Sequence, residues 1–542
     1  MMMMEGSLLR ITLTLLLSLV TIHPPPNFCT AHSDSEVRCI ESDRHALLNF
    51  KHDLLDPSNR LASWASDMDC CDWVGVLCHN VTGHILQLRL KSFPPLYDKF
   101  TINDDAHWDA QYEAYERSVF GGKINPSLLD LKHLIYLDLS FNYFNGTQIP
   151  KFLGSMESLR YLNLSSGGFG GLIPHQLGNL SNLQYLNLGF DYFESNNLYV
   201  KNLQWLSGLP LLQHLDLSYV NLSQASNWLQ DINKLPSLSE LRLSYCQLSR
   251  FIPPPIPSIN FSSLTTLDLS FNYLQNTSIL FWVFDLHNLV SLDLSQNQFQ
   301  GPIPVHLQNL TSLRHLNLYD NSFNSSIPNW LYSFSHLELL NLGFNNLQGT
   351  ISSAIENLTS AISIDLSGNE LEGKVPRSLG NLCNLREIRL SLNKWSQEIS
   401  EIFESLSGCV SNGLELLEMD NAQLSGHLTD DLGQFKNLVI LSLGSNSISG
   451  PIPWSIGNLS SLRSLDLESN QINGTLPQSF GQLSKLESLY IGLNMLKGVV
   501  LEVHFANLMR LKRLVASQTQ LTLEVSDNWT PPFQLNHLDL GS

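Results

Sequence analysis

The chain has 542 residues, and its composition already excludes several classes of protein. Hydrophobic residues make up 43%, with 25 Phe, 15 Tyr and 10 Trp, so the chain can form a packed core and is not intrinsically disordered. The 49 Asp and Glu outnumber the 30 Lys and Arg, which argues against nucleic acid or an anionic membrane surface as a partner. Since one core rarely exceeds about 250 residues, the chain holds either several domains or a repeat array.

Residues 1–31 have the pattern of a secretory signal peptide. Arg10 precedes an apolar run from Ile11 to Ile22, and small residues suited to cleavage follow. This run is shorter than the roughly 20 residues that span a bilayer, and no other segment of the sequence approaches that length. We therefore predict an exported chain that begins near His32 and can form disulfides.

Residues 32–83 are predicted to form an N-terminal cap. Ser42 can cap a helix that the pair Asp56 and Pro57 would end. The apolar side of this helix would consist of Ala46, Leu47, Phe50, Leu54 and Leu55. A helix of this kind can cover the exposed end of a hydrophobic repeat core.

Four cysteines of this segment, Cys39, Cys70, Cys71 and Cys78, fit two disulfides, and spacing alone permits three pairings. Since Cys70 and Cys71 are adjacent, we expect each to bond to one of the other two cysteines, and we favour Cys39–Cys70 with Cys71–Cys78. The spacing from Cys71 to Cys78 does not suit a zinc finger, and export favours disulfides, so no metal site is expected.

Beyond residue 84 the sequence is a repeat array. Three consecutive blocks of about 24 residues align: "LRHLNLYDNSFNSSIPNWLYSFSH" from Leu313, "LELLNLGFNNLQGTISSAIENLTS" from Leu337 and "AISIDLSGNELEGKVPRSLGNLCN" from Ala361. They share the pattern L-x-x-L-x-L-x-x-N-x-L-x-G-x-I-P-x-x-L-x-x-L. The asparagine position of this pattern falls at residues 142, 167, 191, 220, 246, 272, 297, 321, 345, 369, 393, 422, 446, 470, 494 and 519.

An earlier degenerate strand, Ile85 to Leu90, extends the array to about 17 repeats over residues 84–542. An insertion at about residues 91–118 separates that strand from the regular repeats. The last segment, "LNHLDLGS" from Leu535 to Ser542, matches the strand of a further repeat, with its asparagine position due at 543. We therefore expect the array to continue.

The pattern also predicts the fold. In L-x-L, alternation along a strand points both leucines inward and the middle residue outward. The asparagine amide can bond to backbone groups of neighbouring coils. One short parallel strand per repeat then gives an α/β solenoid, a right-handed leucine-rich-repeat superhelix with a concave parallel β-sheet and a disulfide-stapled N-terminal helical cap. Such a sheet presents a surface to a protein or an extended ligand and has no enclosed pocket.

Three cysteines lie within the array. Cys383 and Cys409 fall in adjacent repeats, so a disulfide between them is predicted to staple neighbouring coils. Cys246 occupies the asparagine position of its repeat and is predicted to be a buried thiol with no chemistry.

The cap and the repeat together resemble a known family. The segments "ALLNFKHDLLDPSNRLASW", "CCDWVGVLC" and "LDLSFNYFNGTQIP" resemble the ectodomains of plant leucine-rich-repeat receptor-like proteins. The segment "INPSLLDLKHLIYLDLSFNYFNGTQIPKFLGSMESLRYLNLS" is most similar to the subgroup of the ethylene-inducing-xylanase receptors and, more distantly, to Cf-type resistance proteins. The resemblance covers essentially the whole mature chain.

This resemblance implies an extracellular receptor region in plant defence. Its ligand would be a microbial protein or fragment, and co-receptor and adaptor leucine-rich-repeat kinases would be its partners. The full protein would reach the plasma membrane if it has a membrane helix, and otherwise the apoplast. The alternatives are the ectodomain of a receptor kinase, or a soluble inhibitor or decoy of a microbial cell-wall hydrolase.

Aromatic residues crowd the predicted outward positions of the first repeats, so we expect the first part of the concave face to bind the ligand. One column contains Tyr136, Tyr161, Tyr185, His214 and Glu240, and the column before the asparagine position contains Phe141, Phe190, Tyr219, Tyr245 and Phe271. The alternative for the second column is that its rings only pack on one another. The insertion adds Trp108 and Tyr112 among acidic residues, and such a loop is either functional or disordered.

Thirteen N-x-S/T sequons predict a glycoprotein, although the repeat's own phrases create some of them by default. They are Asn80, Asn145, Asn163, Asn179, Asn221, Asn260, Asn276, Asn309, Asn324, Asn357, Asn458, Asn473 and Asn528. A glycan on Asn163 would stand on the concave face and restrict ligands there.

No catalytic motif emerges from the repeat. The segment from Gly368 to Val375, "GNELEGKV", approaches a phosphate-binding loop but has valine where the hydroxyl residue belongs. We therefore predict no enzyme activity and no cofactor.

Overall fold

A computed structural model describes residues 38–65, 68–94, 105–190, 198–248 and 258–541. The predicted signal peptide lies outside these residues. The chain divides into two compact units: unit 1 comprises residues 1–97 and 105–289, and unit 2 comprises residues 98–104 and 290–542.

Unit 1 begins with the cap. Its helix α2 (Glu41–Asp53) buries Ala46, Leu47 and Phe50, as predicted. The other elements of the cap are β1 (Leu54–Leu55), the 3-10 turn η1 (Cys70–Asp72) and β2 (Val76–Cys78), which runs antiparallel to β3 (Ile85–Arg89). The cap thus pairs directly with the first strand of the array.

Two details of the predicted cap helix are wrong. The helix begins at Glu41, so Ser42 lies inside its first turn and no side chain caps it. The prediction failed because the bond from Cys39 to Cys70 and the carboxylate of Asp69, which accepts from the Cys39 N–H at 3.2 Å, hold the chain immediately before Glu41.

The predicted end of the helix is wrong too. It ends at Asp53 because Leu54 and Leu55 pair as β1 with β4 (Gly121–Gly122), and Leu55 is 64% exposed. Asp56 instead shapes the following turn, where its carboxylate accepts from the N–H groups of Arg60 and Leu61.

The parallel sheet of unit 1 has one short strand per repeat, at the predicted L-x-L positions. After β3 come β5 (Tyr136–Asp138), β6 (Tyr161–Asn163), β8 (Tyr185–Asn187), β10 (His214–Asp216), β11 (Glu240–Arg242) and β12 (Thr266–Asp268). Neighbouring strands pair in parallel and without slippage, so Tyr136 lies beside Tyr161 and Tyr161 beside Tyr185. This register sets the geometry of every outward column.

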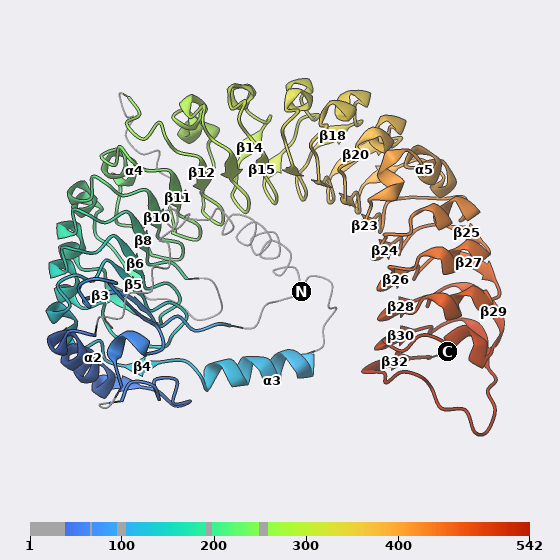
Figure 1. The fold of residues 1–542 in the computed structure, drawn as a ribbon. Coiled ribbons are helices and arrows are strands. Elements are labelled where there is room, and N and C mark those ends of the chain that lie inside the picture. The colour runs from blue at the N-terminus through green and yellow to red at the C-terminus, as the bar shows by residue number, and fades with distance from the viewer. Residues whose placement is uncertain (1–37, 66–67, 95–104, 191–197, 249–257, 542) are drawn as a thin grey trace. The chain divides into compact units, whose positions relative to one another are not determined.

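Short helices and side strands complete the coils of unit 1. The helices are α3 (Asp105–Glu116), η2 (Pro126–Asp130), η3 (Lys151–Ser155), η4 (His175–Asn179), η5 (Gln204–Gly208), α4 (Trp228–Ile232), η6 (Thr277–Leu280) and η7 (Val283–Asp285). The side strands are β7 (Gly171–Leu172) and β9 (Leu198–Tyr199), which pair in parallel. Apart from α3, these helices lie on the side of the unit opposite the sheet, and most of them are 3-10 turns (Figure 1).

Unit 2 repeats the same arrangement. Its sheet consists of β13 (Ser291–Asp293), β15 (His315–Asn317), β17 (Leu339–Asn341), β19 (Ser363–Asp365), β21 (Glu387–Arg389), β23 (Leu416–Glu418), β24 (Ile440–Ser442), β26 (Ser464–Asp466), β28 (Ser488–Tyr490), β30 (Arg513–Val515) and β32 (His537–Asp539). The predicted leucine-rich-repeat solenoid is therefore confirmed in each unit.

The helices of unit 2 are η8 (Val305–Asn309), η9 (Asn329–Ser333), η10 (Ser353–Asn357), η11 (Arg377–Asn381), α5 (Ile399–Ser405), η12 (Cys409–Asn412), η13 (Asp430–Gln434), η14 (Trp454–Asn458), η15 (Gln478–Gln482) and η16 (Glu502–Phe505). Its side strands are β14 (Gln300–Gly301), β16 (Ser322–Phe323), β18 (Gln348–Gly349), β20 (Glu370–Gly373), β22 (Lys394–Trp395), β25 (Ser449–Gly450), β27 (Gln471–Gly474), β29 (Met495–Val500) and β31 (Gln520–Leu523).

Inward leucines form the core, and the asparagine position holds neighbouring coils together. Leu137, Leu241 and Leu465 have no exposed surface. The Asn369 Nδ2 donates to the carbonyl oxygen of Leu342 in the preceding coil, and its Oδ1 accepts from the Leu347 N–H of that coil, both at 3.0 Å. The same two-way bonding recurs from coil to coil, so the buried turns keep their backbone groups satisfied.

Cys246 takes the asparagine position in one coil of unit 1. Its Sγ lies 3.1 Å from the carbonyl oxygen of Leu217, where the Nδ2 of an asparagine would donate, and the side chain is fully buried. The thiol therefore replaces one of the asparagine hydrogen bonds between neighbouring coils.

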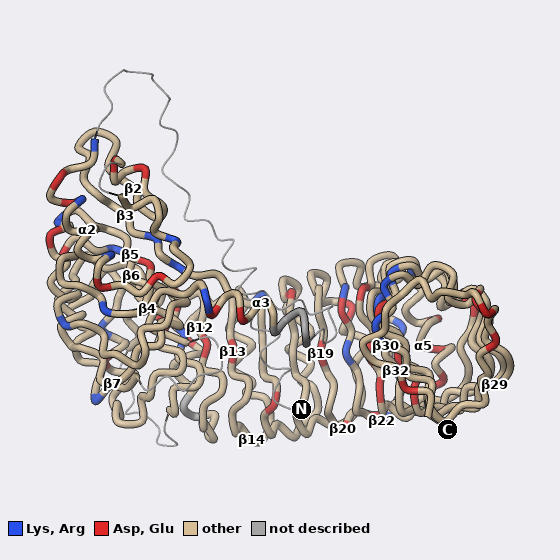
Figure 2. The backbone as a smooth tube through the Cα atoms, turned by 90° about the horizontal axis from the view of Figure 1, so that it is seen from below, with Lys and Arg blue, Asp and Glu red and all other residues tan. Residues whose placement is uncertain are grey.

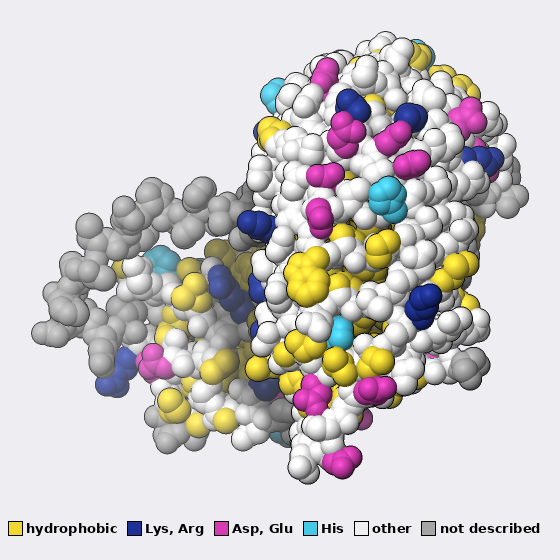
Figure 3. Space-filling view, turned by 90° about the vertical axis from the view of Figure 1, so that its right-hand side faces the viewer, with side chains coloured by type: hydrophobic (Ala, Val, Ile, Leu, Met, Phe, Trp, Pro, Cys, Tyr) yellow, Lys and Arg dark blue, Asp and Glu magenta, His cyan; other side chains and the backbone are white. Residues whose placement is uncertain are grey.

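Exposed apolar side chains gather in the last coils of unit 2, on the side shown in Figure 3. Leu538 and Leu540 are each 54% exposed, although they occupy inward positions of the motif. Elsewhere in the array the next coil covers these positions.

Candidate ligand-binding surface

The first outward column of unit 1 is a continuous stack of rings. The ring centroids are separated by 4.0 Å from Tyr136 to Tyr161, 4.1 Å from Tyr161 to Tyr185 and 4.0 Å from Tyr185 to His214. The planes of adjacent rings differ by 8° to 13°. Because the flat faces cover one another, the column can expose only ring edges and hydroxyl groups.

Charged groups close both ends of this stack. The guanidinium carbon of Arg89 lies 5.2 Å from the centre of the Tyr136 ring. At the other end, His214 Nδ1 lies 2.7 Å from one carboxylate oxygen of Glu240, and Arg242 binds the second oxygen at 2.6 Å. The column is thus fixed in place before any ligand arrives.

Burial and charge set the protonation of this column. Burial, together with neighbouring hydroxyls and carboxylates, raises the pKa of Tyr136 and Tyr161 well above the usual range, so both remain hydroxyl donors. Burial alone would raise the pKa of Glu240, but the hydrogen bond from His214 and the guanidinium of Arg242 lower it to about 2. Glu240 therefore stays ionised and keeps the His214 ring oriented.

The side chains of the next outward column, at the ends of the strands, hydrogen-bond to the backbone of their own turns. The Asp138 carboxylate accepts from the N–H of Ser140 at 3.0 Å, and Asp216 accepts from the N–H of Ser218 at 2.9 Å. These side chains terminate each strand with a local turn. Their polar atoms are consequently occupied by the fold.

The column before the asparagine position lies at a sharp turn. Phe141, Tyr219, Tyr245 and Phe271 have φ between 54° and 67°, a left-handed conformation that bulky residues rarely adopt. This conformation was not predicted from the sequence. Gly368 and Asn421 occupy the same position in other repeats and adopt the same conformation, which glycine and asparagine tolerate.

The rings of this second column pack on one another, as one of the two interpretations predicted. The rings of Tyr219 and Tyr245 stack at 4.7 Å, and Phe190 meets Tyr219 edge-on at 6.2 Å. Packing along the ladder is therefore real. Tyr245 also contacts Phe271 at 6.3 Å between ring centroids, and its side chain nevertheless stays 48% exposed.

The insertion forms helix α3, which was not predicted from the sequence. Its C-terminal end is tied to the start of the outward face, because the Tyr115 hydroxyl donates to the carbonyl oxygen of Phe141 at 3.1 Å. Burial first, then Tyr112 and Glu116, raise the pKa of Tyr115 to about 12, so the hydroxyl keeps its proton. Tyr112 is 37% exposed, whereas the side chain of Trp108 lies outside the described residues.

The cap also anchors this insertion. Arg60 donates to the carbonyl oxygens of Ser118 at 3.1 Å and Lys91 at 2.8 Å, and its guanidinium lies 4.2 Å from the centre of the Phe120 ring. Figure 1 shows α3 extending from this anchored end at β4. The helix is thus held at one end beside the aromatic columns.

The outward face of unit 2 carries paired charges. Arg389 bonds to Glu387 at 2.9 Å and to Glu418 at 3.0 Å, and Arg463 bonds to Glu487 at 2.8 Å. Figure 2 shows basic and acidic residues interspersed along the chain. The outward face of unit 2 therefore carries ion pairs, whereas the outward face of unit 1 carries stacked aromatic rings.

Asp466 on this face predicts a pH-dependent stability. Burial first, with nearby Asp420 and Glu468, raises its pKa from 3.8 to about 7. Because the folded state binds the proton more tightly, stability should fall as pH rises from about 4 to about 7. Asp466→Asn, whose amide oxygen can still accept from the Glu468 N–H, should reduce this fall. Melting temperatures at pH 4.5 and 7.5 test it, and an unchanged pH dependence in the variant would contradict it.

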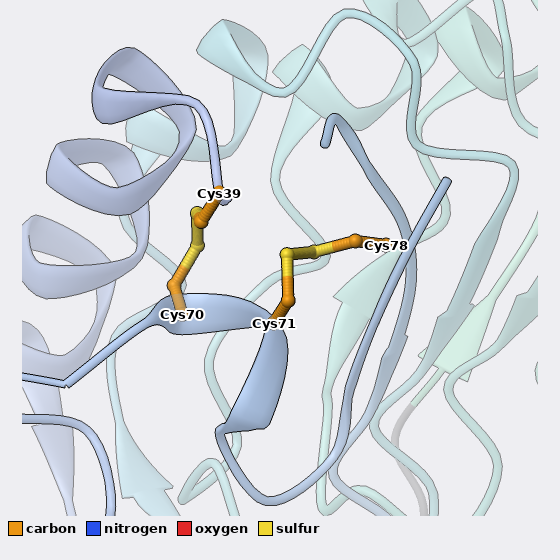
Figure 4. Close-up of side chains that lie close together, drawn as sticks. All are labelled: Cys39, Cys70, Cys71 and Cys78. Atoms are coloured by element: carbon orange, nitrogen blue, oxygen red, sulfur yellow. A yellow bond between two sulfur atoms is a disulfide. The ribbon is translucent and has the colours of Figure 1, made fainter. Parts of the chain in front are cut away.

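The predicted disulfide pairs are present in the structure. Cys39 bonds to Cys70 and Cys71 to Cys78 (Figure 4), and Cys383 bonds to Cys409 between η11 and η12. The sulfur atoms of the four cap cysteines lie within 4.8 Å of one another, but both bonds use up the thiolates that a metal would need. Within the described ranges, no helix is both long and apolar enough to cross a bilayer.

The sequons differ in accessibility. Asn163 is buried and Asn221 is half-buried. The exposed ones are Asn80, Asn145, Asn179, Asn260, Asn276, Asn309, Asn324, Asn357, Asn458, Asn473 and Asn528.

Comparisons with known proteins agree with this architecture. The family model described as a leucine rich repeat N-terminal domain matches residues 40–79, and a leucine-rich repeat region matches residues 120–306. Further leucine-rich-repeat models match residues 312–334, 336–358, 361–382, 437–459 and 460–521.

Two similar relatives are receptor-like proteins of Solanum lycopersicum. Receptor-like protein EIX1 is 39% identical over 289 residues, which is 52% of this chain and 26% of that protein. Receptor-like protein EIX2 is 38% identical over 295 residues, or 54% of this chain and 27% of that protein. The matched part of the chain thus spans about a quarter of the length of these relatives.

Among solved structures, the ectodomain of the Arabidopsis receptor kinase HAESA, in complex with an N-terminally extended IDA peptide hormone ligand, has a TM-score of 0.62. It is 25% identical, and the match covers 92% of this chain and 85% of that one. HAESA with IDA and the co-receptor SERK1 gives the same TM-score.

The repeated strands, the asparagine ladder and the capped first coil define a leucine-rich-repeat protein. Over about half of its length the chain is similar to plant receptor-like proteins.

Proposed function

We propose that this chain is the extracellular ligand-recognition region of a plant cell-surface receptor in defence, and that it binds a microbial protein or fragment. The observation that carries the proposal is the aromatic outward face of unit 1, where the fixed ring stack lies beside the half-exposed Tyr245. Rigid aromatic side chains lose little entropy on binding, which makes them frequent anchors of protein interfaces.

The relatives support the class of ligand and partner. HAESA was solved with a peptide ligand and with a co-receptor, so a protein or peptide ligand and a co-receptor kinase are the kinds of partner that we propose here. Similarity to EIX1 and EIX2 supports a role in defence. We place the chain in the secretory pathway, with the receptor at the plasma membrane, and propose that it has neither enzyme activity nor a cofactor.

Two alternatives deserve separate tests. Similarity to HAESA also supports the ectodomain of a receptor kinase. A soluble inhibitor or decoy of a microbial cell-wall hydrolase would use the same exposed face but block the enzyme it binds. Receptor and inhibitor therefore differ in their effect on the hydrolase.

The experiment combines binding with enzyme inhibition. The secreted chain is titrated with a purified fungal xylanase by biolayer interferometry, and xylan hydrolysis is measured at the same concentrations. We expect saturable binding with Kd below about 10 μM and unchanged hydrolysis. Hydrolysis that falls in step with occupancy supports the inhibitor, whereas no binding to the xylanase or to other secreted fungal hydrolases contradicts the defence proposal.

A further inference from the structure

We infer that Asn163 is a strand-end cap that carries no glycan in the folded protein, although it lies in an N-x-S sequon. It occupies the outward position at the end of β6 and is only 7% exposed. Its Oδ1 accepts from the N–H of Ser165 at 3.0 Å and from the Ser165 hydroxyl at 2.7 Å, and its Nδ2 donates to the Tyr161 hydroxyl at 3.4 Å. Every polar atom of the sequon's asparagine is thus used by the fold.

The equivalent motif in other repeats forms a turn at the end of the strand. Asp268 accepts from the N–H and hydroxyl of Ser270 at 2.9 and 2.6 Å, and Asp365 accepts from Ser367 at 3.0 and 2.5 Å. These carboxylates occupy the same repeat position and form the same turn, but they cannot be N-glycosylated. The sequon at Asn163 is therefore the D/N-x-S cap of the repeat with an amide in place of the acid.

A sugar attached to Nδ2 is sterically incompatible with this position, because the side chain is almost fully covered. In the transfer, the amide nitrogen bonds to the sugar C1, the C1–O bond to the lipid diphosphate breaks with its electron pair leaving on the diphosphate, and the amide nitrogen loses a proton. A modified Nδ2 would carry a sugar in a space that leaves the side chain almost no exposed surface. A chain modified at this position before folding could not form the cap without expelling the sugar from the face of the sheet.

The accessible sequons lie elsewhere. Asn179, Asn309, Asn357 and Asn458 are the exposed last residues of η4, η8, η10 and η14, on the side of each unit opposite the strands (Figure 1). We infer that glycans collect there. Apart from Asn163, no sequon lies within a described strand of the main sheet, so the outward strand positions carry no glycan, which, if the proposed function holds, keeps the ring stack open to a ligand.

The test maps glycans on the secreted protein. Peptide-N-glycosidase digestion in ¹⁸O-water, followed by peptide mass spectrometry, should label Asn179 and Asn357 and leave Asn163 unlabelled. Labelled Asn163 in the folded, secreted fraction would overturn the inference. This readout requires no ligand, so it can fail or succeed independently of the proposed function.

Variants separate the cap from the sequon. Asn163→Asp should keep the melting temperature and the glycan mass, whereas Asn163→Gln should keep the mass but lower the melting temperature. Asn179→Gln, the matched control, should remove one glycan. Asp365→Asn creates a sequon with Ser367 at an equivalent cap, and secreted protein that carries a glycan there would also overturn the inference.

Discussion

Replacing Asn345 with alanine is expected to lower the free energy of unfolding by about 2–4 kcal/mol. Replacing the adjacent Asn346 is expected to change it by less than about 0.5 kcal/mol. The two asparagines are neighbours in the chain, but Asn345 is buried in the ladder and Asn346 is exposed. The pair thus holds residue type and location constant while changing only the role in the ladder.

The expected size follows from the bonds that Asn345 makes. Its Nδ2 donates to the carbonyl oxygens of Leu318 at 3.0 Å and Leu342 at 3.1 Å, and its Oδ1 accepts from the Phe323 N–H at 3.1 Å. Alanine removes these three hydrogen bonds, and each contributes about 0.5–1.5 kcal/mol to stability, which together gives a loss of about 2–4 kcal/mol. Urea unfolding followed by circular dichroism measures the difference, and equal losses in the two variants would contradict the role of the ladder.

Replacing Tyr245 with alanine is expected to weaken xylanase binding at least about tenfold, while Tyr273→Ala changes it by less than about twofold. Tyr245 and Tyr273 are 48% and 51% exposed, so the two variants remove similar surface. Only Tyr245 belongs to the outward aromatic column, where Tyr219 supports one face of its ring at 4.7 Å. Binding is measured by biolayer interferometry, and equal effects would place the interface away from this column.

The fold was largely predictable from the sequence because each repeat contains the residues that determine its strand and its turn. The alternation in L-x-L predicts both the strands and the outward columns, since inward leucines can only be buried by a neighbouring coil. The asparagine predicts the ladder because a buried turn needs a side-chain amide to satisfy its backbone. These features are local and recur, so one repeat predicts the next.

The remaining features depend on contacts between distant residues. The cap helix ends early because β1 pairs with β4, and no local signal in the helix specifies that pairing. The insertion forms α3, whose end is fixed by Tyr115 at Phe141 and by Arg60 at Ser118. Such anchors join segments far apart in the chain.

The sequence predicts which residues of the candidate surface share an outward column, but not which contacts their side chains make. The position of Tyr161 and Tyr185 in one column follows from the repeat, whereas their stacking at 4.1 Å depends on side-chain rotamers. The same limit applies to Asn163, which the sequon pattern marks as a glycan site and the structure uses as a cap. A short motif therefore needs its structural position before its function can be assigned.

We expect the ligand to bind the outward face of unit 1 together with helix α3. Hydroxyl-radical footprinting of the secreted chain with and without a purified fungal xylanase tests it most directly. We expect the xylanase to protect Tyr112 and Tyr245, while Tyr273 and the exposed Trp454 react equally in both samples. Protection of Trp454 or of the outward face of unit 2, with none at Tyr112 or Tyr245, would contradict the claim.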